Sequence, residues 1–572
     1  MTNTTLRNNL GPVLRFGLLG SGIAFYLIAV GMVEGFLERN LIGTLVSVGD
    51  VFLFAGTLAA GLLTARAMKQ RGASVLMAAA GGALAGLVSS VLPVLLTLVI
   101  QVAVLQGGGG ESVFRLRDMF VNFSPGLFDK ITFDQGLLLG NLRFALTCAL
   151  VGLMGTSFVL LPGKWRLAWI NALVWILGVG LFSEMVSQIV QQVFGRGINR
   201  ILFQTKALTP IAGVGLFVIA FAAGYFEINR TARSRWREMP QNRQRQGRVV
   251  LMLLGMLLIL SLPWLVGLFL SQALFIVGLY VVMGLGLNIV VGFAGLLDLG
   301  YVAFFAFGAY TMAILTTTGP LGQGGLTFWT ALPFATLAGV LWGFLLGFPV
   351  LRMRGDYLAI VTLGFGEIIR ILALSNWLAP IEGGAQGVLH IPPPQAFGLV
   401  FNNPQYMYYL NVLAAVFAAF VAIRLRNSRL GRQWMAMRED EDVAEAMGIN
   451  LVQTKLSAFA IGAAFSAIAG AIFAARLGTI FPTTFNILIS INALALIIVG
   501  GMGSIPGVVV GALILVGLPE VLREFEQYRL LLYGILLVVM MRAKPEGFLP
   551  EARRREELHA QDEIQPGGAA SD

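Results

Sequence analysis

The sequence has few charged residues and almost no cysteine or histidine. Only 12% of its 572 residues are Asp, Glu, Lys or Arg, about half the share found in soluble domains, and the mean hydropathy is +0.82. These values exclude a soluble globular protein. A single cysteine, Cys148, excludes an internal disulfide bond, and the two histidines have no neighbouring cysteines that would form a metal site. We therefore expect no bound metal.

The excess of basic residues does not indicate nucleic-acid binding. The formal net charge is +10 at pH 7, but aromatic residues are not interleaved with the basic clusters as they are on surfaces that bind single strands. Cytoplasmic loops of membrane proteins collect Lys and Arg. We attribute the charge to such loops and expect no nucleic-acid partner.

Apolar stretches of about 20 residues, the length that crosses a bilayer as a helix, recur along most of the chain. The predicted fold class is all-α: a polytopic helical membrane protein with roughly sixteen candidate transmembrane or re-entrant helices. The runs at 250–269 and 272–294 are predicted as two of these helices. The predicted domains are extra N-terminal membrane helices (1–227), a basic cytoplasmic linker (228–249), a second membrane domain (250–545) and a disordered cytoplasmic tail (546–572).

Basic residues in the loops predict the orientation. Counting spans from a cytoplasmic N-terminus places the arginine-rich linker, the basic cluster at 424–432 and the tail from Arg542 on one side of the membrane. This agrees with the positive-inside rule, so both termini are predicted to be cytoplasmic. Five basic residues contradict the count locally: Arg115, Arg117, Arg196, Arg200 and Lys206.

A charged segment, residues 431–448, interrupts the apolar sequence on the predicted cytoplasmic side. As one helix, it places Arg438, Glu441, Asp442 and Glu445 on one face and Ala436, Val443, Ala444 and Met447 on another. Gly448 is predicted to end the helix. The segment either binds a soluble partner or is a solvated interfacial helix.

Ionisable residues inside predicted spans form a second candidate group. Glu367 and Arg370 lie three residues apart in one apolar run, and Asp298 lies between two leucines. Charged groups in a span usually face protein or water. They are predicted either to line or gate a translocation path or to hold one helix against another. The nearby glycines Gly300, Gly364 and Gly366 either break helices that line the path or serve helix packing.

Several motifs together resemble one family of membrane proteins. Residues 431–448 resemble the cytoplasmic coupling loop of ABC-importer permeases, and the Arg-Glu-Asp-Glu run at 438–441 is the form seen in branched-chain amino acid (LIV-type) permeases. Further matches lie at 284–292, 297–301, 304–310, 347–352, 354–370, 502–507 and 542–550. Residues 498–501 read Ile-Val-Gly-Gly where the family usually has Val-Leu-Gly-Gly. The resemblance covers about Leu279 to Pro550, and the role of residues 1–248 is open.

The resemblance implies a permease subunit that translocates leucine, isoleucine and valine across the bacterial inner (plasma) membrane, with residues 250–545 as its permease domain. The implied ATPase-coupling residues are Arg438, Glu439, Asp440, Glu441, Ala444 and Gly448. The resemblance also adds Tyr301 to the residues expected to line or gate the translocation path. The implied partners are a homologous permease subunit, two cytoplasmic ATPase subunits, a periplasmic substrate-binding protein and the lipid bilayer.

The chain has no P-loop of its own. Its only Gly-Lys pair, Gly163-Lys164, is followed by Trp165 and not by Ser or Thr. We therefore expect a transporter subunit that is not an enzyme and carries no cofactor, with ATP and Mg bound by the partner ATPase subunits.

Three alternatives remain at this point. The same machinery could carry urea, amides or other amino acids, because the sequences of permease spans indicate the transported molecule only weakly. A self-sufficient secondary transporter would use Glu367, Arg370 or Asp298 for ion coupling and would show inverted repeats, which we do not find between residues 1–248 and 249–550. The N-terminal helices could instead form a sensor or membrane-interaction domain.

Overall fold

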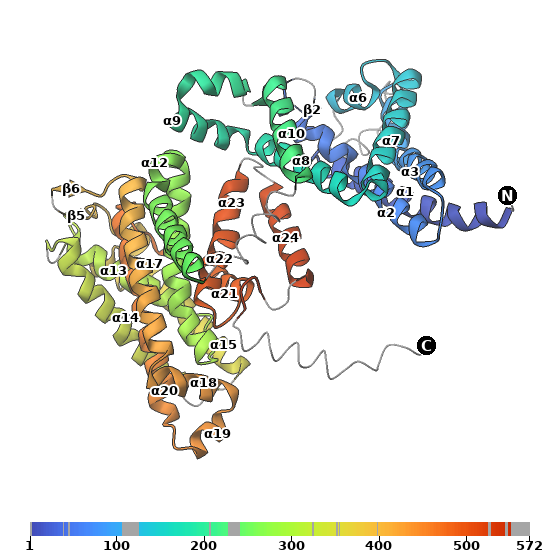
Figure 1. The fold of residues 1–572 in the computed structure, drawn as a ribbon. Coiled ribbons are helices and arrows are strands. Elements are labelled where there is room, and N and C mark those ends of the chain that lie inside the picture. Colours follow the sequence, from blue (N-terminus) through green and yellow to red (C-terminus); the bar gives the residue numbers. More distant parts are fainter. Residues whose placement is uncertain are drawn as a thin grey trace. The chain divides into compact units, whose positions relative to one another are not determined.

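The chain forms two compact helical units, Met1–Met256 and Leu257–Asp572. The computed structural model describes residues 3–37, 39–43, 46–105, 125–204, 207–226, 241–322, 325–350, 353, 355–396, 398–523, 528–543 and 547–550. Figure 1 shows that helices dominate both units, with only a few short strands. Most of the predicted linker (227–240) and nearly all of the tail lie outside the described residues.

The first unit is built around four helices that pack against one another: α1, α2, α3 and α7. Its elements are α1 (Asn3–Ala29), η1 (Glu34–Phe36), β1 (Asn40–Ile42), β2 (Val46–Ser47), α2 (Val48–Gln70), α3 (Val75–Ser89), α4 (Val91–Leu105), α6 (Pro125–Thr132), α7 (Leu137–Leu160), α8 (Gly163–Leu181), α9 (Ser183–Leu202), β3 (Phe203–Gln204), β4 (Ala207–Leu208) and α10 (Pro210–Tyr225). Glycines let these backbones touch, since a methyl group at Gly61 would overlap the Gly152 carbonyl and one at Gly86 would overlap the Cys148 carbonyl.

A substitution of Gly61 by valine is expected to separate α2 from α7. The added side chain has no space against the Gly152 backbone, and overpacking of this kind costs about 1–3 kcal/mol. We expect the unfolding temperature in detergent to fall by about 3 °C or more. Gly22→Val in α1 is the matched control, because no atom lies within 4 Å of a methyl group added there; equal shifts for the two variants would contradict the packing account.

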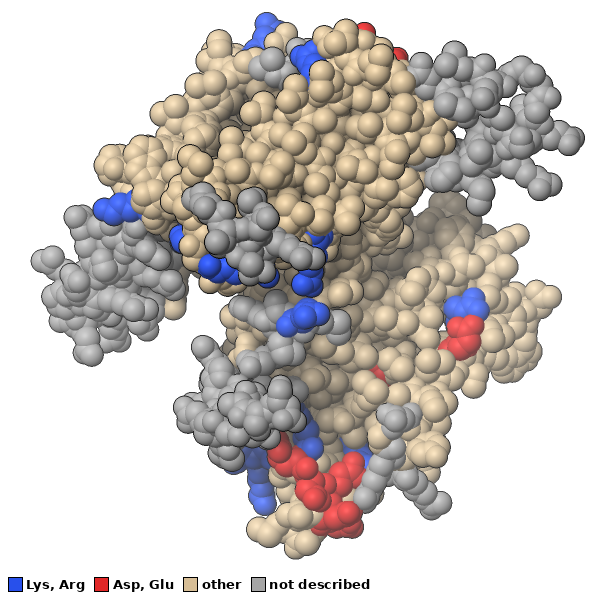
Figure 2. Space-filling model, turned by 90° about the vertical axis from the view of Figure 1, so that its right-hand side faces the viewer, with Lys and Arg blue, Asp and Glu red and all other residues tan. Residues whose placement is uncertain are grey.

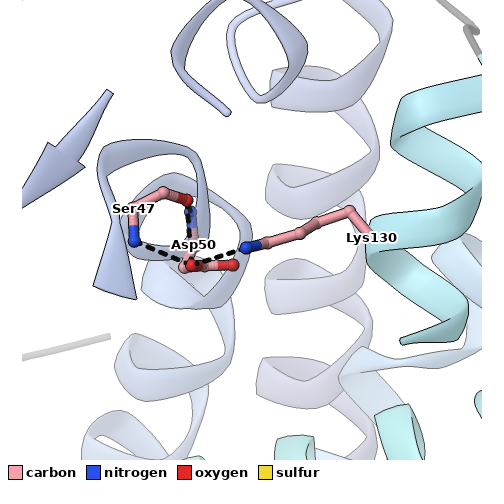
Figure 3. Close-up of polar contacts among 3 residues, drawn as sticks. All are labelled: Ser47, Asp50 and Lys130. Atoms are coloured by element: carbon pink, nitrogen blue, oxygen red, sulfur yellow. Dashed lines mark hydrogen bonds and ion pairs between the residues drawn. The ribbon is translucent and has the colours of Figure 1, made fainter. Parts of the chain in front are cut away.

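A small four-stranded sheet, ordered β2-β1-β4-β3, joins the loop after α1 to the end of α9. Beside it, Ser47 caps α2: the Asp50 N–H donates to Ser47 Oγ (3.2 Å), and the Ser47 N–H donates to Asp50 Oδ2 (2.9 Å). Lys130 of α6 reaches the same carboxylate, with 3.1 Å between Nζ and Oδ2 (Figure 3). The cap therefore also fixes α6 to the start of α2.

The second unit has its core where α13 and α14 pack on α20. Its elements are α12 (Gln241–Leu287, which begins in the first unit), the π-helical η2 (Asn288–Phe293), α13 (Val302–Thr316), α14 (Phe328–Val350), α15 (Asp356–Leu374), α16 (Ala379–Glu382), η3 (Gly384–Gln386), β5 (Gln395–Ala396), β6 (Leu399–Val400), α17 (Pro404–Arg426), α18 (Arg429–Glu439), α19 (Glu441–Ala446), α20 (Leu451–Leu477), η4 (Pro482–Thr484), α21 (Ile487–Gly500), α22 (Ile505–Ala512), the π-helical η5 (Leu513–Gly517), α23 (Leu518–Val521) and α24 (Arg529–Ala543). Gly308 and Gly470 leave no room for a side chain between α13 and α20.

Helix α12 folds back on itself at Gly267. This residue has φ 79° and ψ −179°, outside the helical region, and the Ser271 hydroxyl donates to the Pro263 carbonyl over 3.1 Å. In an unbroken helix, residues eight apart are separated by about 12 Å, so this bond requires a sharp reversal. The apolar runs at 250–269 and 272–294 are thus two limbs joined without a loop. Helix α9 folds back in the same way at Gly195, and Figure 1 shows its two limbs.

The all-α polytopic fold is confirmed, but the predicted number of about sixteen spans is not. Among the described residues, ten helices are long and apolar enough to cross a membrane, or eleven if the bent pair α8–α9 counts as one span. Three apolar runs form only short helices: Pro210–Tyr225, Val302–Thr316 and Ile505–Val521. The two limbs of α12 count as one helix in this number, although the chain reverses at Gly267 between them. Residues 241–249, predicted as linker, belong to the first limb.

Candidate functional site

The charged segment connects the ends of two long helices, α17 and α20. Ser428 caps α18, with Gly431 N–H donating to its hydroxyl over 3.2 Å, and Asn450 caps α20 in the same manner. Figure 1 shows α18 and α19 at one end of the second unit, beyond α17 and α20. Trp434 fixes α18 to α20, since its indole N–H donates to the Thr454 carbonyl (3.0 Å) and the ring is fully buried.

The segment is two helices and not one, so the predicted shared face is wrong. Asp440 has an extended backbone (φ −157°, ψ 117°), and its Oδ1 accepts hydrogen bonds from the N–H groups of Asp442 (2.9 Å) and Val443 (3.0 Å). An aspartate followed by acidic residues favours a helix start over a helix interior. Arg438 therefore lies in the last turn of α18, whereas Glu441, Asp442 and Glu445 belong to α19.

Glu441 holds α19 against α20. Its Oε2 lies 2.9 Å from Nζ of Lys455, and the two side chains are 21% and 3% exposed. Ala444 is buried on the same side of α19, where its small side chain permits close packing. Lys455 is not among the predicted site residues. It is nevertheless an ionisable residue within an apolar run, which is the feature that marks Glu367 as a candidate.

Neutralising Glu441 is expected to release α19. Glu441→Ala leaves Lys455 buried without its carboxylate partner, which costs about 3 kcal/mol locally. Hydrogen exchange should then become faster in residues 441–446 than in α17. The double variant Glu441→Gln/Lys455→Met removes both charges and should restore slow exchange; fast exchange in both variants would mean that the ion pair does not hold the helix.

Gly448 ends α19 as predicted, in a Schellman arrangement. Its φ of +84° is left-handed, its N–H donates to the Glu445 carbonyl (2.9 Å), and the Ile449 N–H donates to the Ala444 carbonyl (3.1 Å). This turn directs the chain from α19 into α20.

The outward side of α19 combines exposed apolar and acidic side chains, and we name it the α19 tip. Val443 and Met447 lie one helical turn apart and are 59% and 79% exposed. The exposed acidic residues around them are Glu439, Asp440, Asp442 and Glu445. Figure 2 shows acidic side chains gathered at this end of the unit. Such a surface suits a partner with an apolar pocket and a basic rim.

Arg438 points inward, away from the α19 tip. Its Nη1 donates to the carbonyl of Gly292 at the end of η2, and its Cγ would lie 2.8 Å from a methyl group added at Gly295, whose φ is +75°. Nearby, the Asn288 side chain accepts from the Gly503 N–H (2.9 Å). Arg438 therefore connects α18 to the chain segment that leads into Asp298.

Asp298, Gly300 and Tyr301 lie together in the buried segment between η2 and α13. Asp298 Oδ1 accepts from the Gly300 N–H (2.9 Å), whereas its Oδ2 has no hydrogen-bond partner among the described residues. Gly300 packs directly on α15, where a side chain would overlap the Thr362 carbonyl, and Gly366 faces Gly300. The Tyr301 hydroxyl donates to the Gly462 carbonyl of α20 (2.7 Å). Gly300 therefore packs on α15 and Tyr301 is bonded to α20, whereas the hydrogen bond of Asp298 stays within its own turn.

Glu367 and Arg370 form an ion pair on the outer side of α15. Arg370 Nε donates to both carboxylate oxygens of Glu367 at 3.0 Å, and the side chains of Glu367 and Arg370 are 41% and 27% exposed. Gly364, also on α15, has no atom near a methyl group added to it. The pair therefore lies on the surface of this chain within a candidate span.

A narrow groove runs along this side of α15, between α13 and the segment around η4. Glu367 lines one end and Arg370 the other, with Val302, Gly366 and Phe485 common to both ends. Tyr310 of α13 also lines the groove beside Arg370. Tyr310 is not among the predicted site residues, because nothing in the sequence marks its hydroxyl as buried without a partner among the described residues. Among the described residues, no group of three or more His, Cys, Asp or Glu could hold a metal ion.

Comparison with known proteins gives consistent matches to the second unit. Residues 269–541 match a family described as the permease component of branched-chain amino acid transport systems. The chain is 45% identical over 298 residues to the high-affinity branched-chain amino acid transport system permease protein LivM of Salmonella typhimurium, covering 48% of this chain and 68% of that protein. It is 28% identical to the probable LivM of Methanocaldococcus jannaschii (49% and 93%) and 25% identical to the permease protein LivH of Escherichia coli (48% and 93%). No solved structure gives a significant match.

Proposed function

Because the chain belongs to the family of branched-chain amino acid transport permease components, we propose that it is the membrane-spanning subunit of an ABC importer for leucine, isoleucine and valine. The 45% identity to a LivM protein over most of that protein's length carries this conclusion. Residues 250–545 form the permease domain in this proposal, and the extent of the family match supports it.

The α19 tip is the proposed docking site for a cytoplasmic ATPase subunit, which would bind ATP and Mg. Val443 and Met447 are exposed apolar side chains on a short helix outside the candidate spans, and burial of such groups stabilises association. The complex would contain a homologous permease subunit, two ATPase subunits and a periplasmic binding protein. Both termini and the α19 tip would face the cytoplasm of a bacterial cell, as the loop charges favour.

Arg438 is the proposed mechanical connection between ATPase and transport path. When ATP binding draws the docked helices together, α18 moves with α19, and the bond from Arg438 to Gly292 displaces the end of η2. The following segment, Asp298–Tyr301, packs directly on α15 through Gly300. Movement at the tip would therefore reach α15 through two contacts, that of Arg438 with Gly292 and that of Gly300 with Thr362.

The outer side of α15 is the proposed location of the translocation path. An ion pair exposed to hydrocarbon is unfavourable, and charged groups in spans usually face protein or water. We infer that the second permease subunit covers Glu367 and Arg370, so that the path runs between the two permeases. This account assigns gating to the pair itself, whereas Asp298, Gly300 and Tyr301 support α15 from behind.

Cargo competition tests the proposed specificity. The complete complex, reconstituted in proteoliposomes with its binding protein, should take up radiolabelled L-leucine, and unlabelled isoleucine and valine should compete. Urea and short amides should not compete. Uptake of urea with no uptake of leucine would assign the same machinery to a different cargo.

A further inference from the structure

We propose that the α13–α15 groove is a transit subsite for a zwitterionic amino acid, with Arg370 and Tyr310 binding its carboxylate. The inference rests on the proposed function and names the residues that contact the cargo. The groove has a charged pair at its polar edge and an apolar floor formed by Val302, Ala306 and Phe485. A branched-chain amino acid has the same two parts, a zwitterionic head and an aliphatic side chain.

Tyr310 provides the strongest observation. Its ring is 5% exposed, and its buried hydroxyl has no hydrogen-bond partner among the described residues. A buried hydroxyl without a partner is destabilising by about 1–3 kcal/mol in proteins, and a ligand group that accepts its hydrogen bond would remove this cost. Tyr310 and Arg370 line the same end of the groove. In the opened groove of this proposal, the Tyr310 hydroxyl and the Arg370 guanidinium both donate to the carboxylate of the cargo.

The Glu367–Arg370 pair fits an exchange of partners. Without cargo, each charge satisfies the other across 3.0 Å. When a zwitterion enters, its carboxylate pairs with Arg370 and its ammonium group with Glu367, so that no charge is left unpaired in either state. Without cargo, Glu367 and Arg370 therefore make with each other the ionic interactions that they make with the cargo when it is bound.

The groove is closed in this structure. The space beside Arg370 is about 10 Å³, which holds one water molecule and not an amino acid. The subsite therefore opens only when α15 moves away from α13, and the second permease completes its outer wall. In the proposed function, movement of Arg438 is passed to Gly292 and from Gly300 to α15, and this would move α15.

Leucine uptake by the reconstituted complex, measured together with assembly of the complex, distinguishes a transit subsite from a packing role for Tyr310 and Arg370. Tyr310→Phe removes only the unpartnered hydroxyl, so a structural role predicts unchanged or improved stability, whereas the subsite predicts about threefold slower uptake of radiolabelled L-leucine. Arg370→Gln should slow uptake about tenfold or more. In both variants, the ATPase subunits should co-purify with the permease as they do with wild type, because the α19 tip is unaltered. Tyr357→Phe on α15 and Arg424→Gln on α17 are the matched controls.

A change in cargo preference gives a second readout. Ala373→Val fills the groove beside Arg370 and should slow leucine uptake more than valine uptake.

Wild-type uptake rates for Tyr310→Phe and Arg370→Gln would overturn the subsite and leave the proposed function in place. Parallel loss of assembled complex, ATP hydrolysis and uptake in Arg370→Gln, with Tyr310→Phe unaffected, would assign the pair to packing and also overturn it. Failure of the wild-type complex to take up leucine would overturn the proposed function itself.

Discussion

Replacement of Val443 and Met447 by aspartate is expected to abolish binding of the ATPase subunit. Both side chains are largely exposed in this chain, so the substitution removes the apolar centre of the docking surface without disturbing the core. Loss of two such anchors weakens an interface by at least about thirtyfold. Co-purification of the ATPase with the detergent-solubilised permease measures the effect directly.

The matched control is Leu399→Asp/Val400→Asp in β6, which also replaces two exposed apolar residues. These residues precede α17, whereas α18 and α19 follow it, so they lie at the opposite end of that candidate span. ATPase binding should be unchanged in this variant. Equal co-purification with the Val443/Met447 variant and wild type would exclude the α19 tip as the docking site.

Replacement of Arg438 by methionine is expected to separate ATP hydrolysis from transport. Methionine retains much of the aliphatic stem that packs on Gly295, but it removes the hydrogen bond from the guanidinium to the Gly292 carbonyl. The ATPase should still bind, because the α19 tip is unaltered. Movement of α18 would no longer be transmitted to η2, and the number of leucine molecules transported per ATP should fall about tenfold.

Arg432→Met provides the control for Arg438. Arg432 is exposed on α18, and its guanidinium donates to the carbonyl of Asn427, which caps the end of α17. Its loss should leave the ratio of leucine to ATP unchanged. A ratio that is equally reduced in both variants, or unchanged in both, would contradict the specific role of Arg438.

The sequence was sufficient for the class of fold, but not for the contacts that the candidate residues make. Hydropathy identified the membrane helices because burial in lipid demands long apolar runs. It could not separate full spans from short helices such as α13, whose ends are set by tertiary structure. The reversal at Gly267 depends on the conformation of one glycine, which the apolar runs on either side do not reveal.

The charged segment at residues 431–448 shows the same limit. The pattern correctly placed Gly448 at the end of a helix, because glycine favours the left-handed conformation found there. It did not reveal that Asp440 starts a new helix, that Glu441 pairs with Lys455, or that Arg438 turns inward. Each of these depends on a partner distant in sequence or on competition between capping and helix continuation.

The energy source for uptake tests the central claim most directly. Right-side-out membrane vesicles that contain the complete complex and its binding protein should accumulate radiolabelled leucine only when ATP is present inside. Uptake should stop when the ATPase subunits are omitted, even with a proton or sodium gradient imposed. Gradient-driven leucine uptake by this chain without ATPase subunits would contradict the account and identify a secondary transporter.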